Sequence, residues 1–426
     1  CLAPSAPLRN PDGSWTPAAG ISGYAAYYEG NNFLNDDYIY LREKISADID
    51  LIKEVLKFQA DYSYNYTGRT ATRVRNYVTY SKEPGVYILE STSVGNGMTE
   101  NKYDTRYHAV NAYTTYSPRL GENNSLIVLL GYNTEWSKYV YTSAERKGFL
   151  SNKYSFNLMD GESSITAGGN EWAYVGAFYR VNYAYKGRYL AELSGRYDGS
   201  SKFPSGQRWG FFPSGSLGWR ISDEPWMNWS RRYLDNFKFR ISAGSMGNGN
   251  VSPYKYASEM TIAKATDFIL DGSLASYTGV ATAVPLTLTW EKSSTYDAGF
   301  DFDMFSSKLS ASFDYYIRMT TDMYTAGLQL PGVYGGTVPK GNNAELRTNG
   351  WETSIQWKDM LKLGGKSFSY SIKGTLWDSY STITRFVGNE AGTFGTIANL
   401  INNMGQPQYY VGMRIGEMWG YTVEGL

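Results

Sequence analysis

The chain has few of the residues on which disulfide scaffolds and most metal and hydrolytic sites depend. Among its 426 residues are one cysteine, Cys1, and one histidine, His108. A disulfide needs two cysteines, and structural zinc sites need several cysteine or histidine ligands. The sequence therefore excludes an internal disulfide framework, a cysteine-based zinc site and any zinc site with two histidine ligands. Cys1 has two interpretations, the lipid-bearing cysteine of a processed lipoprotein or a position without special chemistry, and we favour the second.

An excess of charge of one sign and a long apolar run are also missing. The 40 basic residues balance 40 acidic ones, whereas a nucleic-acid partner would require a clustered basic excess. The longest uniformly apolar run is LIVLL at 126–130, far short of the ~20 residues that a membrane-spanning helix needs. No basic and apolar leader opens the sequence, so no signal peptide is expected. Membrane-spanning β-strands stay open, because each needs only ~9–11 residues with one apolar face.

Aromatic residues and alternating patterns are what the chain has in abundance. It contains 39 Tyr, 45 Gly and 12 Trp, and aromatic residues make up 16% of it. Tyr and Trp are favoured in strands. Residues 237–244, 309–320 and 351–358 alternate between apolar and polar side chains, and this period predicts strands with one wet and one apolar face. Noisier runs of the same kind occur at 56–66, 125–133, 174–185, 213–222, 297–305 and 368–376.

The predicted connections between these strands fall into two classes that roughly alternate along the chain. Some are short and rich in turn-forming residues, and others are long, polar and irregular. The short connections are 120–124, 185–188, 305–308 and 363–366. The long connections are approximately 134–172, 199–209, 246–288, 320–344 and 380–410. An antiparallel up-and-down sheet with tight turns at one end and large loops at the other has this rhythm, which is typical of outer-membrane β-barrels.

Two all-β fold classes stay open on composition and rhythm. Tyr and Trp lie repeatedly near the ends of the predicted strands, as in the aromatic girdles that barrels carry at both membrane interfaces. A soluble β-sandwich with tyrosine-rich faces, such as a carbohydrate-binding module, is the alternative. Loops as long as the predicted ones are uncommon in compact soluble domains, so we favour the antiparallel transmembrane β-barrel.

Candidate catalytic groups are few. His108 has no GxSxG nucleophile motif near it, so an ordinary place on a strand or rim is favoured over a catalytic role. Asp297, Asp301 and Asp303 share one face of a predicted strand. Carboxylates there are compatible with cation binding or acid–base catalysis, but a hydrated polar face is the favoured interpretation. GNGN at 247–250 lacks the third glycine of a dinucleotide-binding loop. We therefore expect no catalytic residue, cofactor site or metal site.

One electrostatic feature is more informative. With the apolar faces directed outward, charged residues of both signs point inward from what would be neighbouring strands. Such charges suit a water-filled or plugged barrel lumen, where they pair and hydrogen-bond. On a sandwich the same residues would form a solvated outer face. The lumen-facing candidates are Glu192, Arg196, Asp198, Arg220, Lys238 and Arg240.

A longer stretch resembles one protein family. Residues 188–227, RYLAELSGRYDGSSKFPSGQRWGFFPSGSLGWRISDEPWM, followed by FKFRISAGSMGNGN at 237–250, resemble the barrel of SusC/RagA-type TonB-dependent outer-membrane transporters. The family pattern is R-x-DGSS-x-F, then WG, FPS-x-S-x-x-W-x-x-S-x-E and K-x-R-x-S-x-G, with GN shortly after. The matching positions are Arg196, Asp198, Gly199, Ser200, Ser201, Phe203, Trp209, Gly210, Phe212, Pro213, Ser214, Ser216, Trp219, Ser222, Glu224, Lys238, Arg240, Ser242, Gly244, Gly249 and Asn250.

Three later segments resemble the same family. Residues 288–323 are similar to its Trp-Glu start, its G-x-D-F segment and the D-Y-Y strand that follows. Residues 342–352 resemble the family's N-x-G-W-E entry to the next strand, and residues 416–426 resemble a later landmark. The matches come in the right order from about residue 100 to 426, which makes the resemblance specific. Residues 1–99 fit only as generic barrel strands.

The resemblance implies part of a 22-stranded barrel, a size at which the lumen must be plugged. It also implies TonB-driven import of a large nutrient through the outer membrane of a Gram-negative, Bacteroidetes-type cell. The implied partners are TonB, a SusD-like surface lipoprotein over the extracellular mouth, outer-membrane lipid, and an oligosaccharide or oligopeptide substrate. No cofactor and no nucleic acid are implied.

The chain departs from the full family pattern in several respects. About a dozen strands are visible, no TonB-contacting box or plug domain is found, and the last residue is Leu426 rather than an aromatic residue. We therefore interpret residues 1–426 as one partial barrel domain, an internal fragment without the N-terminal plug and the C-terminal closing strands.

The first functional hypothesis is import by binding and gated passage, without bond chemistry. In this hypothesis aromatic residues of the long loops stack on sugar rings. The proposed contacts are Trp136, Trp172, Trp226 and Trp229. A soluble or surface carbohydrate-binding or adhesive β-sheet protein is the alternative, and an outer-membrane enzyme is the least favoured.

Overall fold

The computed structural model describes residues 6–417 with several interruptions. The interruptions are 22, 29–31, 77, 84–85, 90–95, 151–153, 261, 271, 280, 282, 286, 328–338 and 390–408. Cys1 and most of the family landmark at 416–426 lie outside the described residues, as does most of the connection predicted at 380–410.

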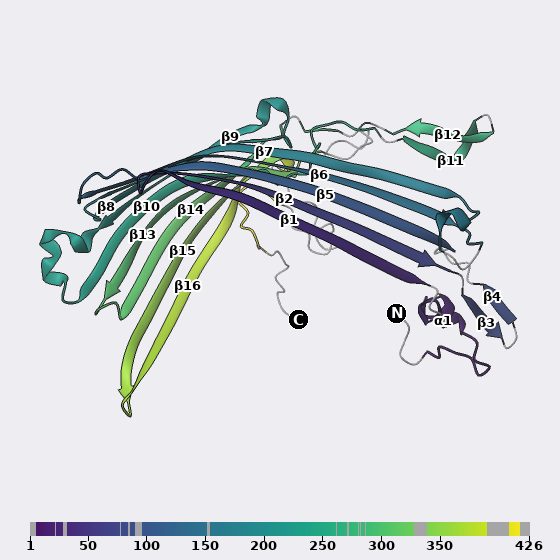
Figure 1. Ribbon diagram of the computed structural model, residues 1–426, viewed down its shortest axis with the longest axis horizontal. Helices are drawn as coiled ribbons and strands as arrows, with labels where there is room; N and C mark the ends of the chain where they lie inside the picture. Colours follow the sequence, from purple (N-terminus) through teal and green to yellow (C-terminus); the bar gives the residue numbers. More distant parts are fainter. Residues whose placement is uncertain are drawn as a thin grey trace, which may run out of the picture. The chain divides into compact units, whose positions relative to one another are not determined.

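Antiparallel strands dominate the described part of the chain. Twelve of them form one sheet, in the order β1-β2-β5-β6-β7-β8-β9-β10-β13-β14-β15-β16 (Figure 1). Their bounds are β1 Phe33–Ile52, β2 Leu56–Arg75, β5 Gly97–Tyr116, β6 Asn124–Lys147, β7 Ser163–Tyr185, β8 Tyr189–Ser200, β9 Trp209–Arg220, β10 Leu234–Asn248, β13 Glu291–Met304, β14 Leu309–Ala326, β15 Lys340–Leu363 and β16 Lys366–Phe386. Each strand lies beside its neighbour in sequence once two inserted hairpins are set aside, so the predicted up-and-down sheet is confirmed.

The remaining elements are short and lie in the connections. Two hairpins, β3–β4 and β11–β12, form separate two-stranded sheets. Their bounds are β3 Thr79–Glu83, β4 Val86–Leu89, β11 Ile262–Leu270 and β12 Ser273–Thr278. The helices are α1 Pro17–Ile21, α2 Tyr24–Tyr28, η1 Phe156–Leu158, η2 Ser205–Gln207, η3 Ile221–Asp223, η4 Pro225–Ser230 and η6 Val387–Asn389. Within the described ranges, no helix has both the length and the apolar character to cross a membrane.

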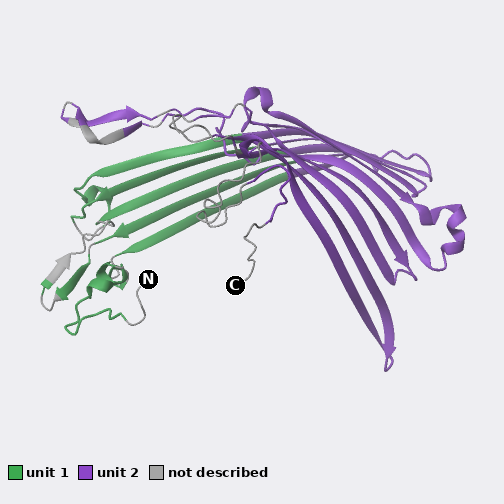
Figure 2. Cartoon of the chain, turned by 180° about the vertical axis from the view of Figure 1, so that it is seen from behind, with its two compact units in different colours: residues 1–45, 61–110, 135–172 green, residues 46–60, 111–134, 173–426 purple. Residues whose placement is uncertain are grey.

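The chain divides into two compact units (Figure 2). Unit 1 contains residues 1–45, 61–110 and 135–172, and unit 2 contains residues 46–60, 111–134 and 173–426. Strands β8 to β16 belong wholly to unit 2. Each unit is therefore described by its own contacts below.

Successive connections from β7 onward alternate between two ends of the sheet, because each of these strands pairs antiparallel with the next. At the short-connection end lie 186–188, 221–233, 305–308 and 364–365. At the long-connection end lie 201–208, 249–290 and 327–339. Three of the predicted turns, at 185–188, 305–308 and 363–366, are confirmed. Gly364 and Gly365, both with positive φ (58° and 78°), allow the tight turn from β15 to β16.

The predicted long connection at 134–172 was wrong. Strand β6 continues to Lys147 and β7 already begins at Ser163, so only residues 148–162 connect them. Residues 134–147 and 163–172 mix polar, small and aromatic side chains without a clear alternation of apolar with polar residues, so a period of two is not visible there. Strands β6 and β7 therefore extend well beyond the residues whose alternating pattern predicts a strand.

Among the residues that the structure describes, buried apolar side chains form three small clusters. In unit 2 one cluster consists of Phe203, Phe212, Val251, Leu288 and Trp290. In unit 1 one consists of Trp15, Ala19, Ala25, Val78 and Tyr80, and another of Val74, Met98 and Met159. The clusters lie at connections, whereas many large apolar side chains of the sheet itself are exposed.

Candidate functional site

The register from β7 to β13 assigns residues to two faces of the sheet. One cross-strand row contains Asn182, Glu192, Ser216, Ser242 and Asp297. The next row, which points to the opposite side, contains Tyr183, Ala191, Leu217, Ile241 and Ala298. We call the side of the first row the charged face and the side of the second row the apolar face.

All six residues predicted to face one way lie on the charged face, because each is an even number of residues from a member of the first row. Arg196 and Asp198 form a two-pronged ion pair, in which Arg196 Nε donates to Asp198 Oδ2 over 3.0 Å and Nη2 donates to Oδ1 over 2.8 Å. The same Nη2 also donates to Asn133 Oδ1 over 2.8 Å. The Arg and Asp at the end of β8 are thus neutralised by each other.

The other predicted residues are placed differently. Glu192 lies 3.6 Å from Arg180 of β7, measured between Oε1 and Nε. Arg220 and Lys238 are direct cross-strand neighbours on β9 and β10. The structure therefore brings the six residues to one face but not into one site.

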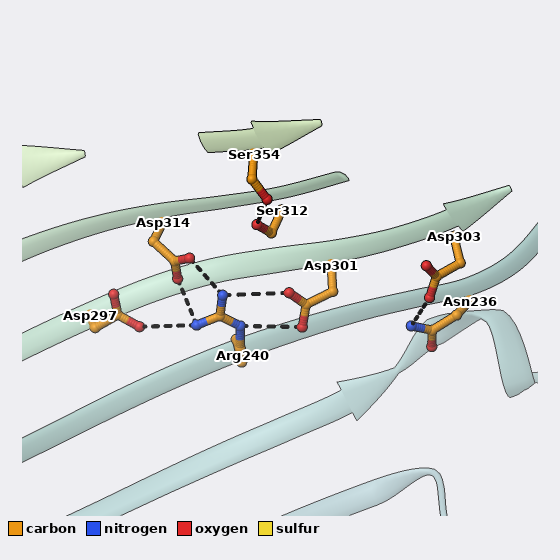
Figure 3. Close-up of polar contacts among 8 residues, drawn as sticks. All are labelled: Asn236, Arg240, Asp297, Asp301, Asp303, Ser312, Asp314 and Ser354. Atoms are coloured by element: carbon orange, nitrogen blue, oxygen red, sulfur yellow. Dashed lines mark hydrogen bonds and ion pairs between the residues drawn. The ribbon is translucent and has the colours of Figure 1, made fainter. Parts of the chain in front are cut away.

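Arg240 is the centre of a charge cluster on this face (Figure 3). Its guanidinium contacts Asp297 and Asp301 of β13 and Asp314 of β14. Nη2 donates to Asp314 Oδ2 over 2.6 Å, Nε donates to Asp301 Oδ2 over 3.3 Å, and Nη1 lies 3.6 Å from Asp297 Oδ1. One cation meets three carboxylates, so the cluster has an excess of negative charge.

The polar network continues along the charged face. Asp303 accepts hydrogen bonds from Asn236 Nδ2 (3.2 Å) and from Ser310 Oγ (2.7 Å). The hydroxyls of Ser312 and Ser354 lie 2.8 Å apart on neighbouring strands. Asp303 shares the charged face with Asp297 and Asp301, as the sequence predicts, and all three carboxylates have protein partners. Among the described residues no group of three His, Cys, Asp or Glu side chains is arranged to hold a metal ion.

On the apolar face, exposed apolar side chains lie between two aromatic rows. Tyr189 stacks on Trp219 at one end (ring centroids 6.5 Å apart), and Tyr197 stacks on Trp209 at the other (5.0 Å). Tyr189 and Tyr197 are about 26 Å apart along β8, at ~3.3 Å per residue. The exposed apolar side chains between the rows include Leu193, Leu217 and Ile241. An apolar band of ~25 Å between aromatic girdles is typical of the lipid-facing surface of a β-barrel.

Of the four tryptophans predicted on long loops, two lie in strands and two lie in a connection. Trp136 lies in β6 and Trp172 in β7, so their assignment to a loop was wrong. Trp226 and Trp229 lie in η4, within the connection 221–233 at the short-connection end. The two strand positions were missed because the residues by which β6 and β7 extend show no clear alternation of apolar with polar side chains.

His108 belongs to an aromatic cluster of unit 1. Its ring stacks on that of Trp136, with centroids 4.7 Å apart and planes at 7°. The hydroxyl of Tyr62 lies 2.9 Å from His108 Nδ1, and the ring of Tyr64 is 4.9 Å away. The surroundings of His108 are those of a packed strand residue.

The sequence analysis missed a second aromatic group, also in unit 1. We call it the aromatic patch, and it consists of Tyr38, Tyr40, Tyr103, Tyr107, Tyr139, Tyr141 and Trp172. The rings of Tyr38 and Tyr40 are stacked, and the guanidinium of Arg69 lies over both Tyr38 (5.4 Å) and Tyr103 (5.2 Å). Arg69 is held by two hydrogen bonds of 2.7 Å to Asp36. Tyrosines two residues apart, which share a strand face, were the signal that could have revealed the patch.

The family-like DGSS motif forms packing at the long-connection end. Strand β8 ends at Ser200, and Phe203 just beyond it is fully buried against Phe212 and Trp290. Trp290 Nε1 donates to the carbonyl of Arg208 over 2.8 Å. The motif is therefore a strand exit anchored by an aromatic core.

Glu224 joins two connections at the short-connection end. Its buried carboxylate accepts hydrogen bonds from Tyr189 OH (2.6 Å), Trp219 Nε1 (2.9 Å) and Arg188 Nη1 (2.9 Å). The hydrogen bonds from Tyr189 and Trp219, with the charge of Arg188, hold the pKa of Glu224 below its ordinary value. The W-x-x-S-x-E pattern thus has a structural reason, which spacing alone does not reveal.

Comparisons with known proteins agree with this architecture. Residues 4–421 match the model of the family "TonB dependent receptor-like, beta-barrel". The chain is 31% identical over 278 residues to TonB-dependent receptor P3 of Formosa agariphila. This alignment covers 64% of this chain and 27% of that protein. It is 27% identical over 328 residues to TonB-dependent receptor SusC of Bacteroides thetaiotaomicron. This second alignment covers 73% of this chain and 31% of that protein.

The solved structure of the RagAB peptide transporter has a similar fold, with a TM-score of 0.72 and 22% identity over 84% of this chain and 38% of that chain. The present chain spans between 27% and 37% of the length of the curated relatives. The family model covers almost the whole chain, and the resemblance found in the sequence is confirmed. The chain belongs to the TonB-dependent receptor β-barrel family, with relatives of the SusC/RagA type, a family of outer-membrane transporters.

Proposed function

We propose that the protein carrying this chain imports a large nutrient, an oligosaccharide or an oligopeptide, across the outer membrane by TonB-dependent transport. A SusD-like surface lipoprotein would act with it. The observation that carries this proposal is the opposite chemistry of the two faces of the sheet. The apolar face has the aromatic rows and uncharged band of a lipid-facing surface, and the charged face has paired charges of both signs.

The charged face would line the lumen. Glu192, Arg196, Asp198, Arg220, Lys238 and Arg240 would then face the transport path. Because Arg196 and Arg240 are already paired with carboxylates, they would offer a hydrated wall rather than a strong trap for charged cargo. Weak and repeated contacts of this kind favour passage, in the same way that conduction requires binding weak enough for release.

The aromatic patch of unit 1 would supply contacts to the cargo. Aromatic faces stack on the apolar side of sugar rings and on aromatic peptide side chains, and phenolic hydroxyls hydrogen-bond to the polar groups between them. Tyr40 is 62% exposed and Tyr38 48% exposed, so their stacked rings are accessible. Passage of this kind needs no bond chemistry. A soluble carbohydrate-binding sheet, the alternative, would leave the apolar face in water, where exposed patches of this kind are unusual.

The proposal is tested on the whole protein, isolated from its native outer membrane through an affinity tag. We expect it to stay in carbonate-washed membranes, to co-purify with one lipoprotein in near-equal amount, and to release an oligosaccharide or oligopeptide that mass spectrometry identifies. Uptake of that compound, once labelled, should cease in cells without TonB. A freely soluble protein would refute the barrel assignment, a preparation without lipoprotein would refute that partnership, and TonB-independent uptake would refute the energy source.

A further inference from the structure

The β9–β10 connection exposes aromatic and basic side chains at the short-connection end. Trp226, Trp229 and Tyr233 are 59%, 76% and 51% exposed. Arg231 and Arg232, which follow η4, are also exposed, and residues 225–233 contain no acidic residue. Large aromatic side chains next to two exposed arginines form a surface for which the transport proposal has no use.

These side chains are not exposed because they lie at an edge of the sheet. Strand β9 is paired on both sides, with β8 and β10, and β10 is paired with β9 and β13. The connection is also fixed to its neighbour, because the carbonyl of Tyr233 accepts a hydrogen bond from Phe305 N over 2.9 Å. Asp235 Oδ2 accepts another from Ser307 N over 2.8 Å. The exposed side chains thus project from a defined position.

Glu224 shows which side of the sheet the connection starts from. The carboxylate accepts hydrogen bonds from Tyr189 and Trp219, which form the aromatic row of the apolar face at this end. Helix η4 begins at the next residue, Pro225. Trp226 and Trp229 therefore lie two and five residues beyond Glu224, the residue that ties this connection to the aromatic row bordering the lipid-facing band.

We propose that residues 225–233, which we call the membrane foot, bind the phospholipid leaflet at the short-connection end. Trp226 and Trp229 insert their rings into the interfacial zone, where an indole places its apolar ring in lipid and its N–H near water. Arg231 and Arg232 contact the phosphates of anionic headgroups, to which basic residues close to the surface are attracted. Short turns of outer-membrane barrels lie on the periplasmic side, so the partner is the anionic phospholipid of that leaflet.

The first test asks where the two indoles lie. The whole protein and its Trp226→Phe/Trp229→Phe variant are reconstituted into phosphatidylcholine vesicles, with and without bromine on the acyl carbons near the headgroup. The difference in emission between the two proteins isolates Trp226 and Trp229. We expect brominated lipid to quench this difference at least twofold and aqueous iodide to have little effect.

A matched variant, Trp209→Phe, serves as the positive control, because Trp209 is 51% exposed in the opposite aromatic row. The difference in emission between the unmodified protein and Trp209→Phe should be quenched by brominated lipid in the same way. In one contrary outcome, brominated lipid quenches Trp209 but only iodide quenches Trp226 and Trp229. The two foot indoles would then face water or a periplasmic protein, and the proposal of a membrane foot would be refuted. If neither responds, the lipid-facing assignment of the apolar face fails, and the foot fails with it.

The second test concerns the headgroup. The unfolding temperature of the whole protein is compared in vesicles of phosphatidylcholine and in vesicles with one quarter phosphatidylglycerol. We expect the anionic lipid to raise this temperature, and Arg231→Gln/Arg232→Gln to lose most of the increase. The control Lys255→Gln/Lys292→Gln removes two exposed cations from the long-connection side and should keep it. An equal increase in all three proteins would refute the phosphate contact.

Discussion

Arg240 offsets the charge of three carboxylates that face it from β13 and β14. Without a cation among them, these carboxylates would repel one another in a partly dehydrated setting. The guanidinium is 31% exposed and the carboxylates between 19% and 33%. The free energy of the cluster therefore lies between that of a surface ion pair and that of a buried one.

We expect Arg240→Gln to lower the free energy of unfolding by about 1–3 kcal/mol, because charged hydrogen bonds are lost and three like charges remain. Thermal unfolding of the whole protein in detergent, followed by heat-modifiable migration on gels, measures the loss. Arg318→Gln, which removes an exposed cation from β14, is the control. Adding Asp314→Asn to the Arg240 variant should recover part of the stability. Equal stability of the Arg240 and Arg318 variants would contradict the prediction.

Glu224 gives a pH dependence whose sign follows from its lowered pKa. A carboxyl whose pKa is lower in the folded state stabilises that state above its unfolded pKa, and this stabilisation is lost as the pH falls through the folded pKa. We therefore expect wild type to lose stability below about pH 4.5. Glu224→Gln should be less stable than wild type at neutral pH, and the difference should shrink in acid.

Unfolding curves between pH 7 and pH 3 check this expectation. The neighbouring Asp223→Asn, at a residue that makes none of the hydrogen bonds to Tyr189 and Trp219, is the matched control. A Glu224→Gln variant that lost stability in parallel with wild type over the whole range would show that the carboxylate has no such role.

At the scale of elements, the ends of the strands are held by packing rather than by turns alone. A Cβ atom on Gly247 of β10 would lie 2.1 Å from the ring of Phe212 on β9, closer than atoms can approach. Phe212 belongs to the cluster of Phe203 and Trp290 at the long-connection end. The glycine therefore makes room for the aromatic core that closes the strand exit of the DGSS motif.

Gly247→Ala should cost about 1–3 kcal/mol of stability, the usual cost of overpacking. Gly215→Ala is the matched control in β9, because the nearest atom to its new Cβ would be 3.7 Å away. Combining Gly247→Ala with Phe212→Leu should remove much of the added cost. Protease cleavage in 201–208 and thermal unfolding of the whole protein measure the effect, and a Gly247 variant as stable as the Gly215 variant would refute the steric explanation.

At the scale of the whole molecule, the two faces of the sheet provide different environments for their side chains. Leu193 lies midway between the aromatic rows of the apolar face and is 52% exposed, whereas Ser216 lies on the charged face beside Glu192. The two positions are on neighbouring strands of unit 2. A charge at each should therefore have opposite consequences if the faces are directed to lipid and lumen.

We expect Leu193→Arg to destabilise the folded protein in lipid vesicles by about 2–4 kcal/mol, as arginine does on the lipid face near the midplane. Ser216→Arg should be tolerated, because Glu192 can pair with the new cation. The yield of heat-modifiable protein after folding into vesicles is the measurement. Tolerance of both substitutions, or the reverse order, would overturn the assignment of faces.

The faces were predictable from the sequence, and the contacts on them were not. A period of two is a local property, so the alternation around Glu192 and Arg240 places them on one side without knowledge of the fold. The partners of Arg240 are 57 to 74 residues away in sequence, and only the register of β10, β13 and β14 brings them together. The roles of Glu224 and Phe203 were hidden for the same reason, although the family resemblance had singled out both positions.

The unbroken register of β7, β8 and β9 has a consequence for how this chain tolerates changes of length. Deleting one residue of β8 before Glu192, such as Leu190, would transfer Leu193 to the charged face and Glu192 to the apolar face, together with the rest of the strand beyond the deletion. Substitutions act on one environment, but such a deletion exchanges two. Natural length variation should therefore accumulate in connections such as 249–290 and be nearly absent from the strands, so the spacing between aromatic rows should be inherited more strictly than the residues within it.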